Sequence, residues 1–182
     1  GYADPDRIAI FGYSYGGFAA MAATVRENGP FKCAIAGAGV SNLGRIGSNW
    51  SDDRIQRAFQ GRTVKGMDPI KNASKANIPI LIYHGDRDVR VPLFHATDFY
   101  NAIKKHTDAE LLVIEDMKHS LPWWPEHHVQ SLSAIENYLR NDCQLRYWAL
   151  CRKSQWLCFE GLCIARAQTN ARATISTALR TQ

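Results

Sequence analysis

Residues 8–21 of the chain read IAIFGYSYGGFAAM, and this stretch decides the fold. The apolar run from Ile8 to Phe11 has no polar alternation, which is typical of a strand buried on both faces of a parallel sheet. The alanine-rich run that continues to Val25 contains no helix breaker and predicts a helix. Ser14 lies between the two runs and is flanked by glycines. The stretch therefore predicts a strand that turns sharply into a helix, with Ser14 at the turn.

Three further apolar runs read as strands of the same kind. Two segments between and after them place apolar side chains at helical spacing, which gives each helix one buried face. Strands that alternate with helices are joined by right-handed crossovers into a parallel sheet. The predicted fold class is therefore α/β, a mostly parallel sheet with flanking helices. The predicted strands span residues 7–12, 32–36, 78–84 and 111–115, and the predicted helices span residues 18–25, 93–105 and 125–140.

A serine on such a turn is a candidate nucleophile. In a strand, turn and helix of the form Gly-x-Ser-x-Gly, the helix N-terminus supplies partial positive charge and free N–H groups. The N–H of Tyr15 would point at a developing oxyanion. Side chains at Gly12 and Gly16 are expected to collide with the neighbouring strand and helix. The alternative is a structural turn with a solvent-facing serine, which predicts no acid and no base downstream.

An acid and a histidine do follow the later strands. The segment HGDRDVRVP, residues 84–92, comes after the third predicted strand, and EDMKHS, residues 115–120, comes after the fourth. The carboxyl ends of parallel strands meet at one edge of a sheet, so we expect these groups beside the serine. Asp86 and Asp88 both fit an acid that orients the base, and His119 is the favoured base. The competing titratable residues are Asp116, His84, His95, His106, His127 and His128.

Neither a metal nor a cofactor is expected. A cluster of His119, His127 and His128 would lack a recognisable ligand spacing. The cysteines near the C-terminus lack the CxxC pairs that are typical of zinc sites. We therefore interpret the cysteines as an unpaired or incidental set. They are Cys33, Cys143, Cys151, Cys158 and Cys163.

The net charge of +5 is concentrated near the C-terminus. Residues 142–182 carry six basic and two acidic residues, and the rest of the chain carries 16 basic and 15 acidic ones. The larger part therefore lacks the basic surface that a phosphate backbone needs, and no nucleic-acid partner is expected. No apolar run approaches the roughly 20 residues that span a bilayer, so no membrane partner is expected either. The sequence leaves the compartment open, and it is compatible with an oligomer.

Residues 142–182 also differ in pattern from the residues before them. They are rich in cysteine, tryptophan, arginine and alanine, and they show no alternation of strands and helices. We therefore expect one domain over residues 1–141 and an appended segment over residues 142–182 that is not part of it.

Residues 1–141 resemble the catalytic domain of the prolyl oligopeptidase family of serine peptidases. The segment DPDRIAIFGYSYGGFAA, residues 4–20, is similar to the nucleophile segment of the family. HGDRDVRVP is similar to its acid segment, His-Gly-x-x-Asp-x-x-Val-Pro, and MKHS, residues 117–120, lies where the family places its histidine. The resemblance selects Asp88 over Asp86. It implies the C-terminal part of an α/β-hydrolase fold with Ser14, Asp88 and His119 as the catalytic residues.

The resemblance further implies hydrolysis of a peptide substrate through an acyl-enzyme. In the family, an apolar pocket beside the serine accepts a small side chain, often proline. The matching positions here are Tyr15, Val40, Leu43 and Val91, and Leu43 replaces an aromatic residue of some dipeptidyl peptidases. An esterase or lipase on the same fold is the runner-up, and a binding module with a vestigial triad is the third alternative.

The family places several strands, and usually a further domain, before the nucleophile segment. These parts are not within residues 1–182, and a second oxyanion donor belongs to them. Loss of one such donor lowers the rate by about 10²–10³. We therefore expect residues 1–182 alone to be inactive or to aggregate, and the full-length parent to be active.

Overall fold

The computed structural model describes residues 4–45, 67–143, 156–159 and 162–165. The chain divides into two compact units, Gly1–Arg146 and Tyr147–Gln182. The first unit contains the sheet and its helices, and the second contains a short hairpin. Within the described part of the chain, no helix has both the length and the apolar character that crossing a membrane requires.

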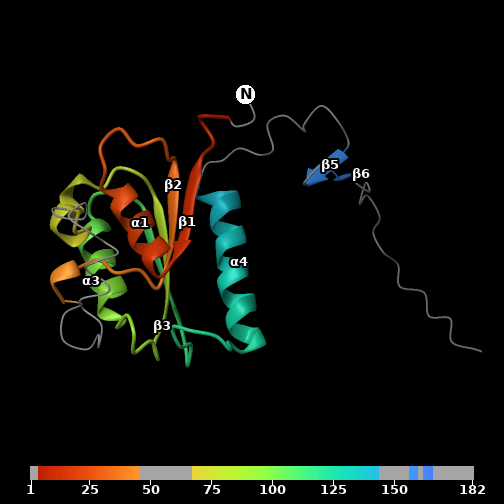
Figure 1. Ribbon diagram of the computed structural model, residues 1–182. Coiled ribbons are helices and arrows are strands. Elements are labelled where there is room, and N and C mark those ends of the chain that lie inside the picture. Colours follow the sequence, from red (N-terminus) through yellow and green to blue (C-terminus); the bar gives the residue numbers. More distant parts are fainter. Residues whose placement is uncertain (1–3, 46–66, 144–155, 160–161, 166–182) are drawn as a thin grey trace, which may run out of the picture. The chain divides into compact units, whose positions relative to one another are not determined.

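A four-stranded parallel sheet forms the centre of the first unit (Figure 1). The strands are β1 (Ala9–Tyr13), β2 (Cys33–Gly37), β3 (Ile80–Gly85) and β4 (Ala109–Ile114), in the spatial order β1-β2-β3-β4. Every residue of β2 and β3 is buried, as expected for parallel strands covered on both faces. The α/β class and the four predicted strands are confirmed, with each end within two residues of its predicted position.

Helices cover both faces of this sheet. In Figure 1, α1 (Tyr15–Thr24) and α3 (Phe94–Ile103) lie on one face and α4 (Pro125–Asn141) lies on the other. Two short 3-10 helices, η1 (Leu43–Arg45) and η3 (Ile70–Lys75), fall in the connection between β2 and β3. The three predicted helices are confirmed, although α1 begins at the residue after Ser14 rather than at Phe18.

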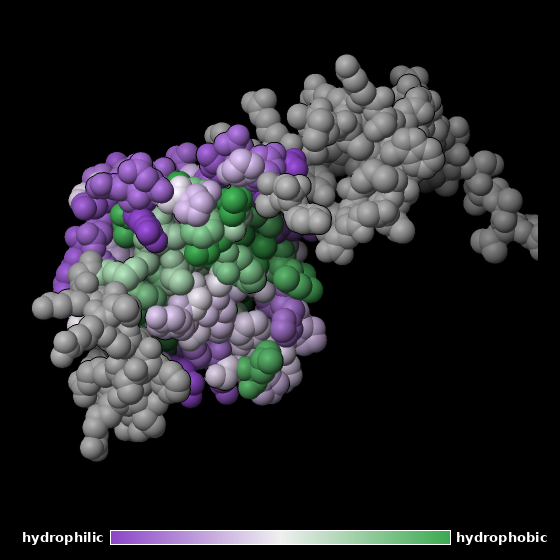
Figure 2. All heavy atoms as spheres, turned by 45° about the horizontal axis from the view of Figure 1, so that its top comes forward, coloured by the Kyte–Doolittle hydropathy of each residue, from purple (hydrophilic) through white to green (hydrophobic). Residues whose placement is uncertain are grey.

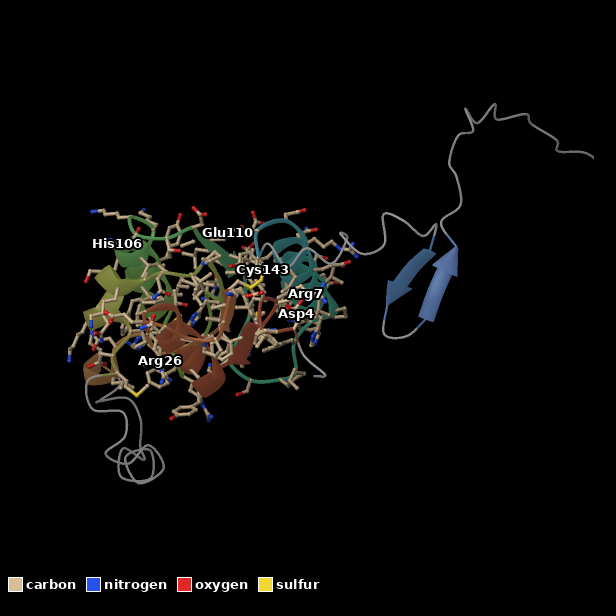
Figure 3. All side chains as sticks on the ribbon, turned by 90° about the horizontal axis from the view of Figure 1, so that it is seen from above. Asp4, Arg7, Arg26, His106, Glu110 and Cys143 are labelled. Carbon is tan, nitrogen blue, oxygen red and sulfur yellow. A yellow bond between two sulfur atoms is a disulfide. The ribbon has the colours of Figure 1, made fainter. Side chains whose placement is uncertain are left out.

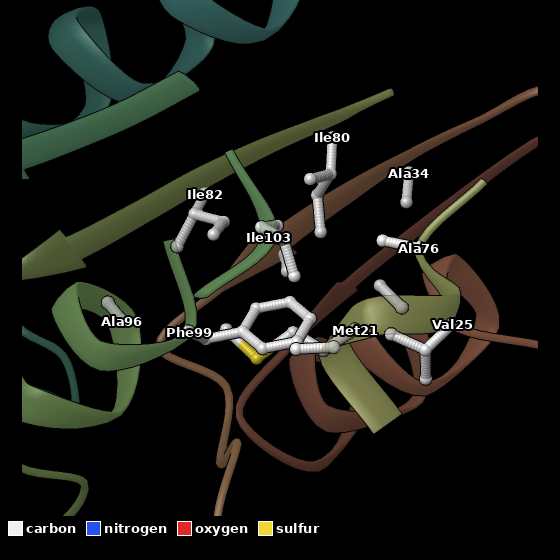
Figure 4. Packing of buried hydrophobic residues seen from close by; sticks show 12 residues of the cluster. Met21, Val25, Ala34, Ala76, Ile80, Ile82, Ala96, Phe99 and Ile103 are labelled. Atoms are coloured by element: carbon white, nitrogen blue, oxygen red, sulfur yellow. The ribbon is translucent and has the colours of Figure 1, made fainter. Parts of the chain in front are cut away.

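Successive residues of β3 pack alternately into two hydrophobic core layers, one on each face of the sheet. Ile80 and Ile82 pack with Met21 of α1 and Phe99 of α3, as Figure 4 shows. Leu81 and Tyr83 belong to the opposite layer, which α4 covers. Burial of each such side chain stabilises the fold by about 1.5–3 kcal/mol. This packing holds the carboxyl ends of the strands at one rigid edge.

A disulfide joins Cys33, at the start of β2, to Cys143, two residues beyond α4 (Figure 3). Their Cα atoms are 5.4 Å apart, which is within the usual range for a disulfide. Both residues are buried. The interpretation of these two cysteines as unpaired is therefore wrong. It failed because β2 and the end of α4 are adjacent only in the folded chain. The link also joins Cys143 covalently to the sheet.

The second unit contains one hairpin in its described residues. β5 (Trp156–Phe159) pairs antiparallel with β6 (Leu162–Ala165). The sequence shows no strand pattern here, because runs of four residues are too short for a periodicity to appear.

Several large apolar side chains of the first unit are exposed. Phe11 on β1 is 59% exposed, and Val129 and Leu132 on α4 are each 63% exposed. Figure 2 shows hydrophobic residues gathered across the face in view, with hydrophilic residues around them. β1 is an edge strand of the described sheet, so its outer side is open to pairing with a further strand.

Candidate active site

The turn between β1 and α1 holds Ser14 in a left-handed backbone conformation. Its φ of 58° is one that residues other than glycine rarely adopt. The N–H of Ser14 donates to the carbonyl oxygen of Gly37 over 2.8 Å, and its own carbonyl oxygen accepts the N–H of Phe18 over 3.0 Å. Backbone hydrogen bonds therefore fix the turn on both sides and leave the hydroxyl at the carboxyl edge of the sheet.

This turn is too tight for a side chain at two glycines. A Cβ at Gly12 would overlap the carbonyl group of Gly16, as the sequence predicts. Among the described residues, a Cβ at Gly16 would meet no heavy atom within 4 Å, so the predicted collision at Gly16 is wrong. Gly17 is the second constrained position, because a Cβ there would overlap the carbonyl oxygen of Gly37 on β2. The prediction failed because α1 turns Gly17, rather than Gly16, toward the sheet.

Ser14, His119 and Asp88 form a hydrogen-bonded line. Nε2 of His119 lies 2.9 Å from Oγ of Ser14, and Nδ1 of His119 lies 2.6 Å from Oδ2 of Asp88. The three side chains come from the ends of β1, β3 and β4, which share one edge of the sheet. The side chains of Asp88 and His119 are only 1% and 8% exposed. Such a line can pass a proton from a hydroxyl to an imidazole while a carboxylate holds the ring.

The surroundings of Asp88 keep its carboxylate ionised. Burial alone would raise the pKa of Asp88, but hydrogen bonds from His119, from His84 and from the N–H of Val91 outweigh it. The pKa of Asp88 therefore lies well below its usual range. Oδ1 accepts the N–H groups of Arg90 and Val91 over 3.0 and 2.8 Å. Nε2 of His84 donates to the carbonyl oxygen of Val91 over 2.7 Å, so His84 braces the loop that carries Asp88.

The competing titratable residues lie outside this line. Asp86 is exposed, and Asp116 pairs with Arg87 over 3.2 Å on the surface. Nδ1 of His127 accepts the N–H of Trp124 at the start of α4. His106 and His128 are exposed. No group of three or more potential metal ligands occurs among the described residues.

The first residue of α1 is Tyr15, the residue after Ser14. N–H groups in the first turn of a helix have no acceptor within the helix, and they carry part of the positive end of its dipole. The N–H of Tyr15 belongs to this first turn. The Tyr15 side chain is 52% exposed, and its ring lies 5.5 Å from that of Phe18.

Three of the four residues matched to the substrate pocket, Val40, Leu43 and Val91, lie together. Val40 and Val91 are buried in one cluster with Phe18, and Leu43 packs against it from η1. All of these residues except Phe18 are predicted from the sequence, and Phe18 is the one that it missed. Its signal was its position on the predicted helix, three residues after Tyr15 and one turn beyond Ser14. The cluster is a small apolar group at the end of the sheet that carries Ser14.

Two buried polar residues hold the backbone beside this cluster, and the sequence alone identified neither role. Oδ1 of Asp68 accepts the N–H of Leu43 over 2.6 Å. Nδ1 of His95 accepts the N–H groups of Ser41 and Asn42 over 3.3 and 3.4 Å. Burial, together with the charges of His84 and Arg45, lowers the pKa of His95 to about 4. The imidazole therefore stays neutral at pH 7 and keeps its acceptor atom.

A surface cavity of about 680 Å³ opens beside His119. Its walls come from the loop after β3, the loop after β4 and the start of α4. They include Arg87, Val89, Lys118 and Trp124. Val89 and Trp124 are exposed apolar side chains, and the two cations lie next to them. Because His119 also lines it, the cavity borders the triad.

A family model described as the prolyl oligopeptidase family matches residues 1–145. This chain belongs to the prolyl oligopeptidase family. The resemblance stated from the three motifs is thereby confirmed, and the match covers the strand, turn and loop segments that carry them.

Named relatives agree with this membership. The chain is 30% identical over 146 residues to the uncharacterized peptidase YuxL of Bacillus subtilis, covering 74% of this chain and 22% of the relative. A puromycin-hydrolyzing peptidase of Mycobacterium tuberculosis superposes with a TM-score of 0.65 at 27% identity, covering 75% of this chain and 22% of that one. An acylaminoacyl peptidase in complex with Z-Gly-Gly-Phe-chloromethyl ketone superposes with a TM-score of 0.64 at 23% identity, covering 76% and 24%. This prolyl oligopeptidase family chain therefore has the α/β-hydrolase fold of these peptidases.

Proposed function

We propose that the protein containing this chain hydrolyses peptide bonds through an acyl-enzyme formed on Ser14. One observation carries the proposal: Oγ of Ser14, the imidazole of His119 and the carboxylate of Asp88 are joined by contacts of 2.9 and 2.6 Å. Membership of a peptidase family supports peptides over other acyl compounds. The chain spans about a fifth of the length of the curated relatives it matches.

In the acylation step, Oγ of Ser14 attacks the carbonyl carbon of the peptide bond while Nε2 of His119 takes the hydroxyl proton. The carbonyl oxygen becomes negative and receives the N–H of Tyr15. Asp88 stabilises the imidazolium that forms. The C–N bond then breaks, the proton passes from Nε2 to the leaving amine, and the acyl group stays on Ser14 as an ester.

In the deacylation step, water takes the place of the amine. Nε2 of His119 removes a proton from the water as its oxygen attacks the ester carbon. The bond to Oγ of Ser14 breaks, and the same proton returns to Oγ. The products are a carboxylic acid and the free enzyme, with no change in oxidation state.

The apolar cluster beside the serine suggests the preferred acyl side chain. Val40, Leu43, Val91 and Phe18 offer no charged group to a substrate. We propose that they receive proline or another small apolar residue on the acyl side of the cleaved bond, with Tyr15 at the rim. The walls are short aliphatic groups and one ring, which fits a small side chain better than a charged one.

The test uses the complete reading frame that contains this chain. A fluorophosphonate probe should label Ser14, and an aminoacyl-proline amide should be hydrolysed. Ser14→Ala should abolish both, whereas Ser133→Ala, an exposed serine on α4, should change neither. Faster turnover of simple acyl esters than of any peptide amide would favour an esterase. A folded protein that the probe fails to label would instead be a binding module.

A further inference from the structure

The residue before the nucleophile reaches across to the loop that carries the base. The phenol O–H of Tyr13 donates to the carbonyl oxygen of His119 over 2.8 Å. Two consecutive residues, Tyr13 at the end of β1 and Ser14 in the turn, therefore both contact His119. Ser14 contacts its imidazole and Tyr13 contacts its backbone. The Gly-x-Ser-x-Gly pattern does not specify this residue, because position 13 is one of its variable positions.

Packing directs the phenol of Tyr13 toward this loop. Its ring centroid lies 5.4 Å from that of His119 and 5.2 Å from that of Trp123, the latter in an edge-to-face arrangement. The ring of Tyr83 on β3 lies 6.0 Å away on the sheet side. Aromatic rings at these separations attract one another. The ring of Tyr13 is therefore held in place independently of its hydrogen bond.

The loop from Asp116 to Trp124 has no regular backbone pattern, so individual hydrogen bonds hold it in place together with the burial of Met117. The N–H of Arg87 donates to the carbonyl oxygen of Met117, and Nε1 of Trp123 donates to that of Lys118 over 2.9 Å. Among the described residues, the phenol of Tyr13 is the group that hydrogen-bonds the backbone of His119 itself. This bond therefore acts at the residue whose position matters most to the triad.

The phenol remains a donor at neutral and alkaline pH. Burial raises the pKa of Tyr13, and the negative charge of Asp88 and the neighbouring Tyr83 raise it further, to well above its usual range. The hydrogen bond from Tyr13 to His119 therefore persists at neutral and alkaline pH.

We propose that Tyr13 is a positioning residue of the triad, which fixes the backbone of His119 and thereby the distance from Nε2 to Oγ of Ser14. This inference rests on the proposed peptidase function. In that reaction Nε2 must first take the proton of Ser14 and then deliver it to the leaving amine. A misplacement of 1 Å in a reacting group can lower the rate by about 10². Because the hydrogen bond of Tyr13 links His119 to the strand that precedes Ser14, it affects both proton transfers.

The test compares two phenols in the complete protein. Tyr13→Phe removes the oxygen that bonds His119 and keeps the ring. Tyr83→Phe is the matched control, since Tyr83 belongs to the same ring cluster and its phenol shows no hydrogen bond to another described residue. For each variant, kcat and KM are measured on an aminoacyl-proline amide. The kcat is expressed per site labelled by the fluorophosphonate probe, so that misfolded protein does not count.

The expected result is a fall of about fivefold or more in kcat per labelled site for Tyr13→Phe, the effect of one lost hydrogen bond, with KM unchanged. Tyr83→Phe should keep the wild-type kcat per labelled site. Three outcomes would overturn the inference: an unchanged kcat per site in Tyr13→Phe, an equal fall in both variants, or a rise in KM alone. Failure of the proposed function looks different, because the wild-type protein itself would then be neither labelled nor active.

Discussion

The carboxylate of Asp88 divides its two oxygens between the base and its own loop. Oδ2 lies 2.6 Å from Nδ1 of His119, and Oδ1 accepts the N–H groups of Arg90 and Val91. The loop therefore fixes the position of the carboxylate independently of its contact with the imidazole. A buried carboxylate held in this way orients the ring and stabilises its charged form. Both effects depend on an acceptor oxygen at the Oδ2 position.

Asp88→Asn is expected to lower kcat about 10⁴-fold in the complete protein. The amide keeps the shape of the carboxylate, but its NH₂ group favours the wrong imidazole tautomer for proton transfer from Ser14. The measurement is kcat on an aminoacyl-proline amide, with circular dichroism to show that the fold remains. Asp86→Asn is the control, because Asp86 is exposed and its loss should leave kcat unchanged. A large loss in Asp86→Asn and none in Asp88→Asn would reassign the acid.

The strands, and the meeting of Ser14, Asp88 and His119 at one edge of the sheet, could be predicted because their signals are local. β3 is a continuous apolar run, and its periodicity does not depend on its neighbours. Ser14, Asp88 and His119 each follow such a run, and the ends of parallel strands meet at one edge. A parallel sheet thus turns three positions far apart in the sequence into one site. The resemblance to a family was needed only to choose between Asp86 and Asp88.

The features that the sequence did not reveal depend on contacts between distant segments. Cys33 and Cys143 are separated by 110 residues, and no spacing rule connects them. The hydrogen bond from Tyr13 to His119 spans a similar distance in sequence, and each residue alone has an ordinary local role. In the sequence, His95 is an ordinary histidine on an amphipathic helix. Only the folded structure shows that its Nδ1 accepts the N–H of Ser41. Tertiary packing, rather than local propensity, decides these contacts.

Val40→Ala is expected to shift the acyl preference toward a larger side chain. Val40 is buried beside Phe18 and Val91, so removing two methyl groups enlarges the space at the proposed pocket. A change of this size in an apolar pocket alters discrimination by about 10–200-fold. The measurement is the ratio of kcat/KM for two amides that differ only in having proline or leucine before the cleaved bond. Val129→Ala, on the exposed face of α4, should leave this ratio unchanged. An unchanged ratio in Val40→Ala would place the pocket elsewhere.

Reduction of the disulfide is expected to lower the free energy of unfolding by about 2–5 kcal/mol. The link between Cys33 and Cys143 closes a loop with a sequence separation of 110, and long loops gain most from closure. Denaturant titration with and without dithiothreitol measures the change. The double variant Cys33→Ala/Cys143→Ala should be less stable than the oxidised protein and insensitive to dithiothreitol. If dithiothreitol lowers the stability of this variant as much as that of the wild type, the stabilising link involves other cysteines.

The stability of the domain is expected to fall as the pH drops from about 6.5 to about 4, and His95 is the cause. Burial lowers the pKa of His95 from its usual 6.5 to about 4. Above this window His95 is neutral in both the folded and the unfolded chain. Within it, the unfolded chain binds a proton that the folded chain does not. Each pH unit then removes up to about 1.4 kcal/mol from the free energy of unfolding.

His95→Gln tests this origin of the pH dependence. Glutamine offers an acceptor oxygen to the N–H groups of Ser41 and Asn42 but does not titrate. Denaturant titrations at several pH values between 4 and 7 should therefore give a flatter slope for His95→Gln than for the wild type. His106→Gln, at an exposed histidine, should keep the wild-type slope. The pKa of Asp88 is held low, so its protonation removes stability only below its usual 3.8, outside this window. If His95→Gln keeps the wild-type slope, the proton responsible binds to another group.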